Sequence, residues 1–380
     1  MTMVGNKRSK MIFFDTTNSG HHFLYNCNVL EGFDISGESY VYLSKLNKDQ
    51  QRQLALKKIT YKVLDTKSTN VRLHDLELII KMFFYMLKSR IKKVHFLYLD
   101  SIFPQLLILL PILLLFRLQV TGTLHWYPKQ MYKIKIMNFM INLGIIKNII
   151  VHGEYTKDKL IKEFKGLNND NVTSIQYPYI HNDNEKSGYE PPLQKLGSVP
   201  HILLFGGLRH DKGLDILLEA ASIIKEKQFI LLIIGKEEYF KQNDVRSYID
   251  FYNLKDKVYL EIGYVPDEMV SSYFNMSDIV VLPYRKVFAG QSGPLTEGAA
   301  KSKVIIGPNH GEIGHTISKY NLGLTFKTEN VNDLAQKLRY CIDHLEEIKT
   351  NIRPGLDNYQ NLIKVSRFKK AYYSVLANNH

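Results

Sequence analysis

The chain has 380 residues, 45% of them hydrophobic and 23% charged, a balance that excludes a disordered or fibrous protein and, at about 100–200 residues per domain, predicts two domains. Its two cysteines, Cys27 and Cys341, exclude a disulfide framework and a cysteine-rich zinc site and are typical of a reducing compartment. Of the formal net charge of +13, +12 falls in residues 1–180, where 25 Lys and Arg stand against 13 Asp and Glu; nucleic acid, an anionic membrane or an acidic lipid-linked substrate would each satisfy this charge.

The first half of the sequence alternates short β-rich runs with helical stretches. This alternation predicts parallel βαβ units in a doubly wound sheet. The apolar run at 11–14 is too short for the core of a signal peptide. The expected strands are 11–15, 39–43, 59–64, 94–99, 120–124 and 148–152, and the expected helices are 73–90, 102–116, 130–143 and 156–164.

The apolar stretch 102–116 is shorter than the ~20 residues that a spanning helix needs. It also contains Pro104 and Pro111. We expect a buried helix here, and the alternative is an interfacial helix that lies on a bilayer.

Residues 181–200 are polar and hold two glycines and three prolines, which predicts a linker between domains at 1–180 and 201–360. We expect a helix at 361–380 to pack back on the N-terminal domain. The fold class is therefore α/β, with two doubly wound Rossmann-like domains facing each other across a cleft and ligands bound at the carboxyl ends of strands. The second domain is expected to have strands at 201–205, 229–234, 258–261, 279–282 and 304–306 and helices at 214–224, 267–274, 296–301 and 331–340.

A glycine-rich turn, GGLRHDKG over 206–213, leads from a strand straight into a helix. Glycines let the backbone approach a ligand, and a helix N-terminus offers free N–H groups to an anion. Arg209 and Lys212 add two positive charges, so the turn predicts a pyrophosphate site, although it does not match the P-loop pattern. The alternative is a strand–helix turn with two solvated basic side chains.

A second glycine-rich loop, AGQSGPLTEGAA over 289–300, follows about 80 residues later. Its N–H groups again suit phosphate. Glu297 is expected to open a helix and could accept hydrogen bonds from both hydroxyls of a ribose. The alternative is that Glu297 only complements the helix dipole.

Two candidate positions lie in the first half. A predicted strand ends in His125-Trp126, and a histidine at that end of a strand points into the ligand crevice, with a core histidine as the alternative. The first strand leads into a turn with Gly20, His21 and His22. The two histidines could be ordinary loop residues or could bind an acceptor, and without further spaced ligands they are poor evidence for a metal.

At these residues the sequence resembles the GT-B glycosyltransferases, specifically the retaining family called group 1 or family 4, over nearly the whole chain. The family's G-x-x-x-x-K-G segment is matched at 207–213, and its loop with a glutamate and small residues at 291–300. The turn at 125–128 is similar to the family's H-D-x-x-P turn, and 151–156 to the segment that follows it. These four matching segments, taken together in this order, identify the family far more specifically than any one of them does alone.

The resemblance implies a role for each matching residue. Arg209 and Lys212 would neutralise the nucleotide diphosphate as it leaves, with no metal required, and His125 would lie over the donor sugar; these three form the catalytic set. The implied donor-binding residues are Gly20, Gly207, Gln291, Ser292, Gly293 and Glu297, and the implied acceptor-side residues are His21, His22 and Trp126.

The sequence departs from the family at two positions. Many members carry two glutamates separated by seven residues, and the first falls on Ala289, which leaves the donor sugar open. Trp126 stands where the family has aspartate. The sequence contains no D-x-D motif, in agreement with a metal-free mechanism, because hard cations prefer paired carboxylates.

We therefore expect a metal-independent glycosyltransferase without a cofactor. It would move a sugar from a UDP- or GDP-sugar to a glycan or lipid-linked acceptor in capsule, exopolysaccharide or cell-wall synthesis, and the resemblance implies retention. The basic first domain predicts a cytoplasmic protein bound peripherally to the inner face of an anionic membrane.

Three alternatives remain at this point. A nucleotide-sugar epimerase of the same fold would differ in its products. A nucleic-acid-binding protein would use the basic half, which lacks the interleaved basic and aromatic motifs of known modules. A catalytically silent partner subunit would explain Ala289.

Overall fold

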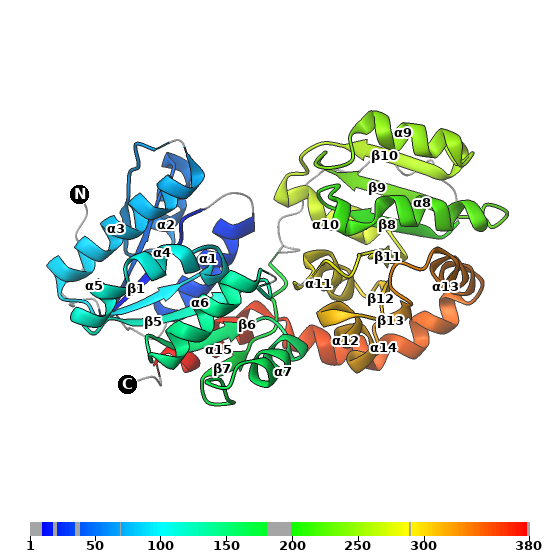
Figure 1. The fold of residues 1–380 in the computed structure, drawn as a ribbon. Helices are drawn as coiled ribbons and strands as arrows, with labels where there is room; N and C mark the ends of the chain where they lie inside the picture. The colour runs from blue at the N-terminus through cyan, green and yellow to red at the C-terminus, as the bar shows by residue number, and fades with distance from the viewer. Residues whose placement is uncertain are drawn as a thin grey trace. The chain divides into compact units, whose positions relative to one another are not determined.

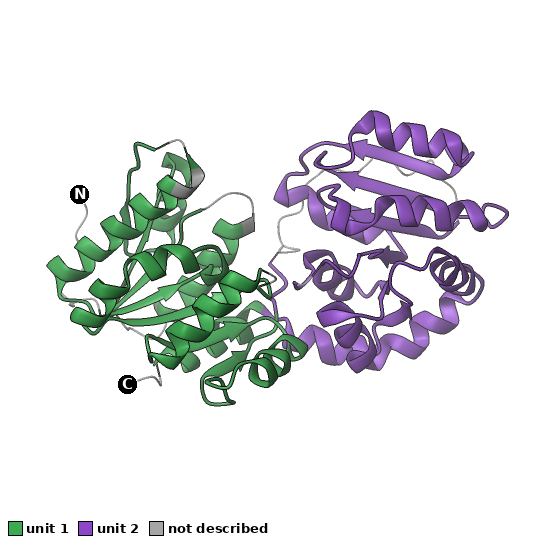
Figure 2. Cartoon of the chain, viewed as in Figure 1, with its two compact units in different colours: residues 1–176, 365–380 green, residues 177–364 purple. Residues whose placement is uncertain are grey.

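The computed structural model describes residues 10–17, 21–34, 39–68, 70–128, 130–180, 199–288 and 290–377. It divides the chain into two compact units, shown in Figure 2. Unit 1 comprises residues 1–176 and 365–380, and unit 2 comprises residues 177–364.

Unit 1 is built on a parallel sheet of seven strands in the order β3-β2-β1-β4-β5-β6-β7. The order reverses between β1 and β4, the point where ligands bind in doubly wound sheets. β1 is buried along its whole length, as expected for a strand covered on both faces. The strands are β1 Met11–Phe14, β2 Tyr40–Ser44, β3 Tyr61–Val63, β4 Lys93–Phe96, β5 Gln119–Leu124, β6 Ile146–Val151 and β7 Val172–Ser174.

The helices of unit 1 form one layer on each face of its sheet. Right-handed crossovers place α1 and α2 on one face and α3 to α7 on the other. The C-terminal helix α15 packs on α1, and α4 packs on α3, α5 and α6. The helices are α1 His21–Asp34, α2 Lys48–Leu56, α3 Val71–Ser89, α4 Phe103–Ile108, α5 Leu110–Leu115, α6 Met131–Asn142, α7 Glu154–Glu163 and α15 Val365–Ala377 (Figure 1).

Unit 2 holds a parallel sheet of six strands in the order β10-β9-β8-β11-β12-β13. Its order reverses between β8 and β11, so the loops after these two strands lie side by side at the carboxyl edge. The strands are β8 His201–Phe205, β9 Ile230–Gly235, β10 Val258–Ile262, β11 Ile279–Val281, β12 Val304–Pro308 and β13 Gly323–Phe326.

The helices of unit 2 also cover both faces. α13 packs on α8, which contacts α9, while α11 contacts α10 and α14. The helices are α8 Leu214–Ile223, α9 Gln242–Phe251, α10 Asp267–Met276, α11 Gly293–Ala300, α12 Gly311–Tyr320, α13 Val331–Asp343 and α14 Leu345–Leu362. The prediction of two doubly wound α/β domains is confirmed.

Two predicted helices need correction. The single buried helix expected at 102–116 is two short helices, α4 and α5, that meet at Leu109, because Pro111 cannot continue a helix. Several of their apolar side chains are exposed. α11 begins at Gly293, three residues before the start expected at 296, because Ser292 caps it. In the described part of the chain, no helix has the length and apolar character needed to cross a membrane.

Candidate functional site

The glycine-rich turn of unit 2 connects β8 to α8 at the point where the strand order reverses. Gly206 has a φ of +107° and Gly213 a φ of +64°, values that L side chains rarely adopt. A Cβ on Gly213 would lie 2.1 Å from the carbonyl oxygen of Pro283. The two glycines therefore let the turn lie directly against the segment that follows β11.

Lys212 folds its side chain back over this turn. A Cβ on Gly206 would lie 2.7 Å from Lys212 Nζ, and the ammonium lies 5.6 Å from the centroid of the Tyr284 ring. Lys212 is half-buried, and across the described ranges no carboxylate forms an ion pair with it. This places a cation without a carboxylate partner at the carboxyl end of the central strand, where an anion would meet it.

Arg209 is already paired within the same turn. Its Nε and Nη2 donate to the two carboxylate oxygens of Asp211, both at 2.9 Å. Burial lowers the pKa of Arg209, but the hydrogen bonds and charge of Asp211 raise it overall. Its guanidinium also lies 5.9 Å from the centroid of the Phe288 ring. Arg209 therefore offers an incoming anion less free charge than Lys212 does.

Arg285 ties the segment after β11 to the glycine-rich turn. Its backbone N–H donates to the carbonyl of Asp211 at 2.9 Å, and its Nη1 donates to the carbonyl of His210. Its Nη2 forms an ion pair with Asp215 at 2.6 Å. These contacts fix the two loops in one arrangement, which is needed if both are to bind one ligand.

The second glycine-rich loop ends at the N-terminus of α11. The Ser292 hydroxyl accepts a hydrogen bond from Leu295 N–H at 3.3 Å and so caps the helix, and Gln291 Oε1 accepts from Ser292 N–H at 3.2 Å. Gly293 is the first helical residue, and Glu297, which is 5% exposed, lies one turn further in. Glu297 is thus not at the helix start, which weakens the alternative that it only complements the dipole.

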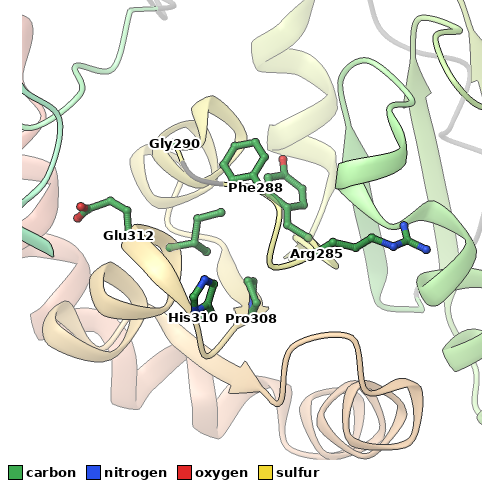
Figure 3. A pocket seen from close by; sticks show the side chains of 8 residues that line it. Arg285, Phe288, Gly290, Pro308, His310 and Glu312 are labelled. Carbon is green, nitrogen blue, oxygen red and sulfur yellow. The ribbon is translucent and has the colours of Figure 1, made fainter. Parts of the chain in front are cut away.

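A pocket lies between this loop and the start of α12 (Figure 3). Arg285 extends away from it toward the glycine-rich turn, and Phe288 and His310 border it. Tyr284 lines the pocket, and its hydroxyl oxygen lies 3.4 Å from Ser292 Oγ. The ammonium of Lys212 lies over the ring of the same tyrosine. The pocket therefore adjoins the candidate anion site. It is lined by Tyr284, Arg285, Phe288, Gly290, Pro308, His310, Glu312 and Ile313.

In unit 1, three aromatic rings stack at the carboxyl edge of the sheet. The rings of His22 and Tyr98 are 4.0 Å apart, and those of Tyr98 and His125 are 3.8 Å apart. His125 Nε2 donates to the carbonyl of Leu97 at 3.0 Å, which fixes its tautomer because a carbonyl only accepts. Asp100 Oδ1 accepts from the backbone N–H of His125 at 3.1 Å.

Buried titratable groups surround this stack. Burial raises the pKa of Asp15, which accepts from Asn26 Nδ2 at 2.7 Å, to about 7. Burial likewise raises the pKa of Asp100 to about 6. Desolvation lowers the pKa of His152 to about 4, so the ring is neutral and its Nε2 accepts from Tyr25 Oη at 2.9 Å. Perturbed groups gathered at one sheet edge are typical of functional sites.

Comparison with known sequences finds a family match and a relative. Residues 190–352 match the family described as glycosyl transferases group 1. These residues are less than half of the chain, and we call them the group 1 domain after the family that they match. An uncharacterized glycosyltransferase of Methanocaldococcus jannaschii is 31% identical over 150 residues, which are 39% of this chain and 40% of that relative.

Solved structures extend the likeness to the whole fold. A glycosyltransferase from Rickettsia africae superposes with a TM-score of 0.71 over 99% of this chain and 100% of its own, at 21% identity. Anabaena HepE in complex with UDP superposes with a TM-score of 0.74 over 97% of this chain and 100% of its own, at 13% identity. The predicted GT-B fold, with one sheet in each domain, is confirmed.

The group 1 domain contains most of the predicted site residues. Arg209, Lys212 and Ser292 gather around Tyr284 and Phe288. Gly207 lies in the same turn, where a Cβ would meet the Glu238 carboxylate. Outside this domain, the structure brings His22 and His125 into one stack through Tyr98, and Trp126 is half-buried. Gly20, Ala289 and the side chain of His21 lie outside the described residues.

Sequence reasoning missed several residues that shape these sites. His310 and Glu312 line the pocket of the group 1 domain, and the turn Pro308-Asn309-His310-Gly311 after a buried strand was the signal that could have found them. Asp100 was also missed, because only the folded chain brings it to the backbone of His125. Among the described residues, no cluster of His, Cys, Asp and Glu could hold a metal ion.

Proposed function

We propose that the chain is a metal-independent glycosyltransferase that moves a sugar from a nucleotide-sugar donor to a glycan or lipid-linked acceptor. The observation that carries the proposal is Lys212, a half-buried cation without a carboxylate partner in the described part of the chain, at the turn after β8. It lies within the group 1 domain. A fixed cation at that point suits a diphosphate whose negative charge grows as it leaves.

Each side chain of the site has a task in this reaction. The ammonium of Lys212 binds the diphosphate oxygens and stabilises the charge that develops when the glycosidic bond to phosphate breaks. Arg209, held by its ion pair with Asp211, adds positive charge beside Lys212. The N–H groups at the start of α11 add a partial positive charge. Glu297 holds the ribose hydroxyls, and Gly207, Gln291 and Gly293 leave room and polar contacts for the donor.

We propose the donor and the acceptor from the chemistry of the site residues and from the similarity to solved structures. UDP is bound by the Anabaena neighbour, and we propose a UDP-sugar for this chain, with a GDP-sugar as the alternative. His125 would contact the donor sugar near the reacting carbon, the sugar would be transferred with retention, and His22 and Trp126 would serve the acceptor. Gly20 and His21 belong to the same proposal. The product would be a capsule, exopolysaccharide or cell-wall glycan.

We also propose a peripheral position on the inner, anionic face of the cytoplasmic membrane. The +12 charge of residues 1–180 supports this, since each Lys or Arg near anionic lipid contributes about 1 kcal/mol. A lipid-linked acceptor is displayed at that surface.

The proposed reaction is tested by product analysis. The full chain is incubated with sugar-labelled UDP- and GDP-sugars in EDTA, with lipid-linked glycans as acceptor and with water alone. We expect nucleoside diphosphate and a new glycoside with acceptor, slow release of free sugar with water, and undiminished rates in EDTA. Inhibition that Mn²⁺ restores would contradict the metal-free mechanism. Conversion of the donor to an epimeric nucleotide sugar would identify the epimerase instead.

A further inference from the structure

The exposed apolar side chains of the chain concentrate in one segment of unit 1. Nine of the eighteen large apolar side chains that are exposed in the described ranges fall between residues 107 and 143. That segment runs from the end of α4 through α5 to the residue after α6. The three helices are neighbours in Figure 1, and α4 packs directly on both of the others. Exposed apolar side chains that concentrate on helices packed against one another are typical of an interaction site.

The α4–α5 pair contributes five of these side chains. Ile108 is 63% exposed and Leu115 is 76% exposed, while Leu107, Leu114 and Phe116 are exposed to a smaller degree. Because Pro111 breaks the apolar stretch into two short helices, each helix buries part of its residues and presents the rest outward. The segment is too short to span a bilayer but suits its interface.

α6 adds the other four. Met131, Tyr132, Phe139 and Leu143 are exposed and follow helical spacing, so they lie on one face of the helix. The opposite face is buried, with Met137, Met140 and Ile141 in the core. α6 therefore carries apolar side chains on both faces, and the core of unit 1 covers only one of them.

The charge within this segment has a single sign. Residues 101–150 contain five Lys and Arg and no Asp or Glu. Lys135 is exposed in the middle of the outer face of α6, and Arg117 is exposed just after α5. Two such surfaces on two copies of the chain would repel each other, whereas an anionic bilayer complements both the charge and the apolar side chains.

We propose that the exposed surface of α4, α5 and α6 inserts into the interface of an anionic bilayer. The nine apolar side chains enter the headgroup region, and Lys135 and Arg117 contact lipid phosphates. This inference rests on the proposed function for its purpose, because it presents the chain to a lipid-linked acceptor. It goes beyond that proposal by naming the surface.

The test is co-sedimentation of the full chain with vesicles of phosphatidylcholine, with and without phosphatidylglycerol. We expect binding to the anionic vesicles only. The double variant Ile108→Ser/Leu115→Ser should lose at least about tenfold in partitioning, and Lys135→Gln about fivefold. Phe251→Ser is the matched control, since Phe251 is 77% exposed on α9 of unit 2, and it should bind as the native chain does.

Three outcomes would overturn the proposal. They are no binding of the native chain to anionic vesicles, equal losses in the double variant and in Phe251→Ser, or a native dimer that the double variant converts to monomer. Donor hydrolysis in solution keeps the two proposals separate. The double variant should retain it, and its absence in the native chain would count against the glycosyltransferase while leaving vesicle binding unaffected.

Discussion

Lys212→Ala is expected to lower donor turnover by at least about tenfold, and by more than Arg209→Ala does. One charged contact to a developing anion is worth about 1.4 kcal/mol or more in the transition state. Lys212 points back over Gly206 with no carboxylate paired to it within the described ranges, whereas Arg209 is held by both oxygens of Asp211. The lysine therefore supplies most of the net positive charge.

The measurement is kcat/KM for release of nucleoside diphosphate from the donor. Lys225→Ala is the matched control, because Lys225 is an exposed lysine just beyond the other end of α8, and it should leave the rate unchanged. A native rate in Lys212→Ala would contradict the assignment of Lys212 to the diphosphate site. A much larger loss in Arg209→Ala would mean that the arginine leaves Asp211 when the donor binds.

Gly213→Ala is expected to cause the largest loss of stability among single substitutions in the glycine-rich turn. Alanine at a φ of +64° costs about 1–2 kcal/mol, and its Cβ would lie 2.1 Å from the carbonyl oxygen of Pro283, a backbone atom that cannot rotate away. The start of α8 and the segment after β11 must then separate. We expect a loss of about 3 kcal/mol or more, together with loss of donor turnover.

Gly263→Ala provides the control for this loss. A Cβ on Gly263 would meet no atom within 4 Å, so its effect should stay within about 0.5 kcal/mol. Thermal unfolding midpoints of the two variants are compared with that of the native chain. Equal midpoints for both variants would show that the turn tolerates a side chain and that the close approach to Pro283 is not needed.

Many of the strands could be predicted from the sequence, because a short apolar run marks a buried strand locally. HILLF at 201–205 is an apolar run between Pro200 and Gly206, and β8 coincides with it. α14 could not be predicted in this way, because Pro354 and Gly355 are typical helix breakers. In the structure Pro354 lies inside α14, and a Cβ on Gly355 would lie 1.8 Å from the carbonyl oxygen of Tyr320. The glycine permits a close contact between helices that no local pattern encodes.

The candidate site could likewise be predicted only in part. The turn at 206–213 and the loop before α11 were predicted because glycines, charges and a helix start stand together in sequence. The ion pair between Arg209 and Asp211 was not predicted, since the two residues are only near neighbours in a polar turn. This pair leaves Lys212 as the cation of the turn without a carboxylate partner in the described ranges. For 102–116 the sequence favoured a buried helix over an interfacial one, because an apolar run does not reveal which of its side chains the fold leaves exposed.

The central claim is a diphosphate site at the turn after β8. Its most direct test is nucleotide binding by the full chain, measured as a thermal shift in the presence of EDTA. A ligand that binds the folded state raises the unfolding midpoint, and the rise grows with its affinity at a fixed ligand concentration. We predict that UDP or GDP raises the midpoint of the native chain clearly more than UMP or GMP, and that Lys212→Ala loses this difference. No shift with any nucleoside diphosphate, or equal shifts with mono- and diphosphates, would contradict a diphosphate site at the turn after β8.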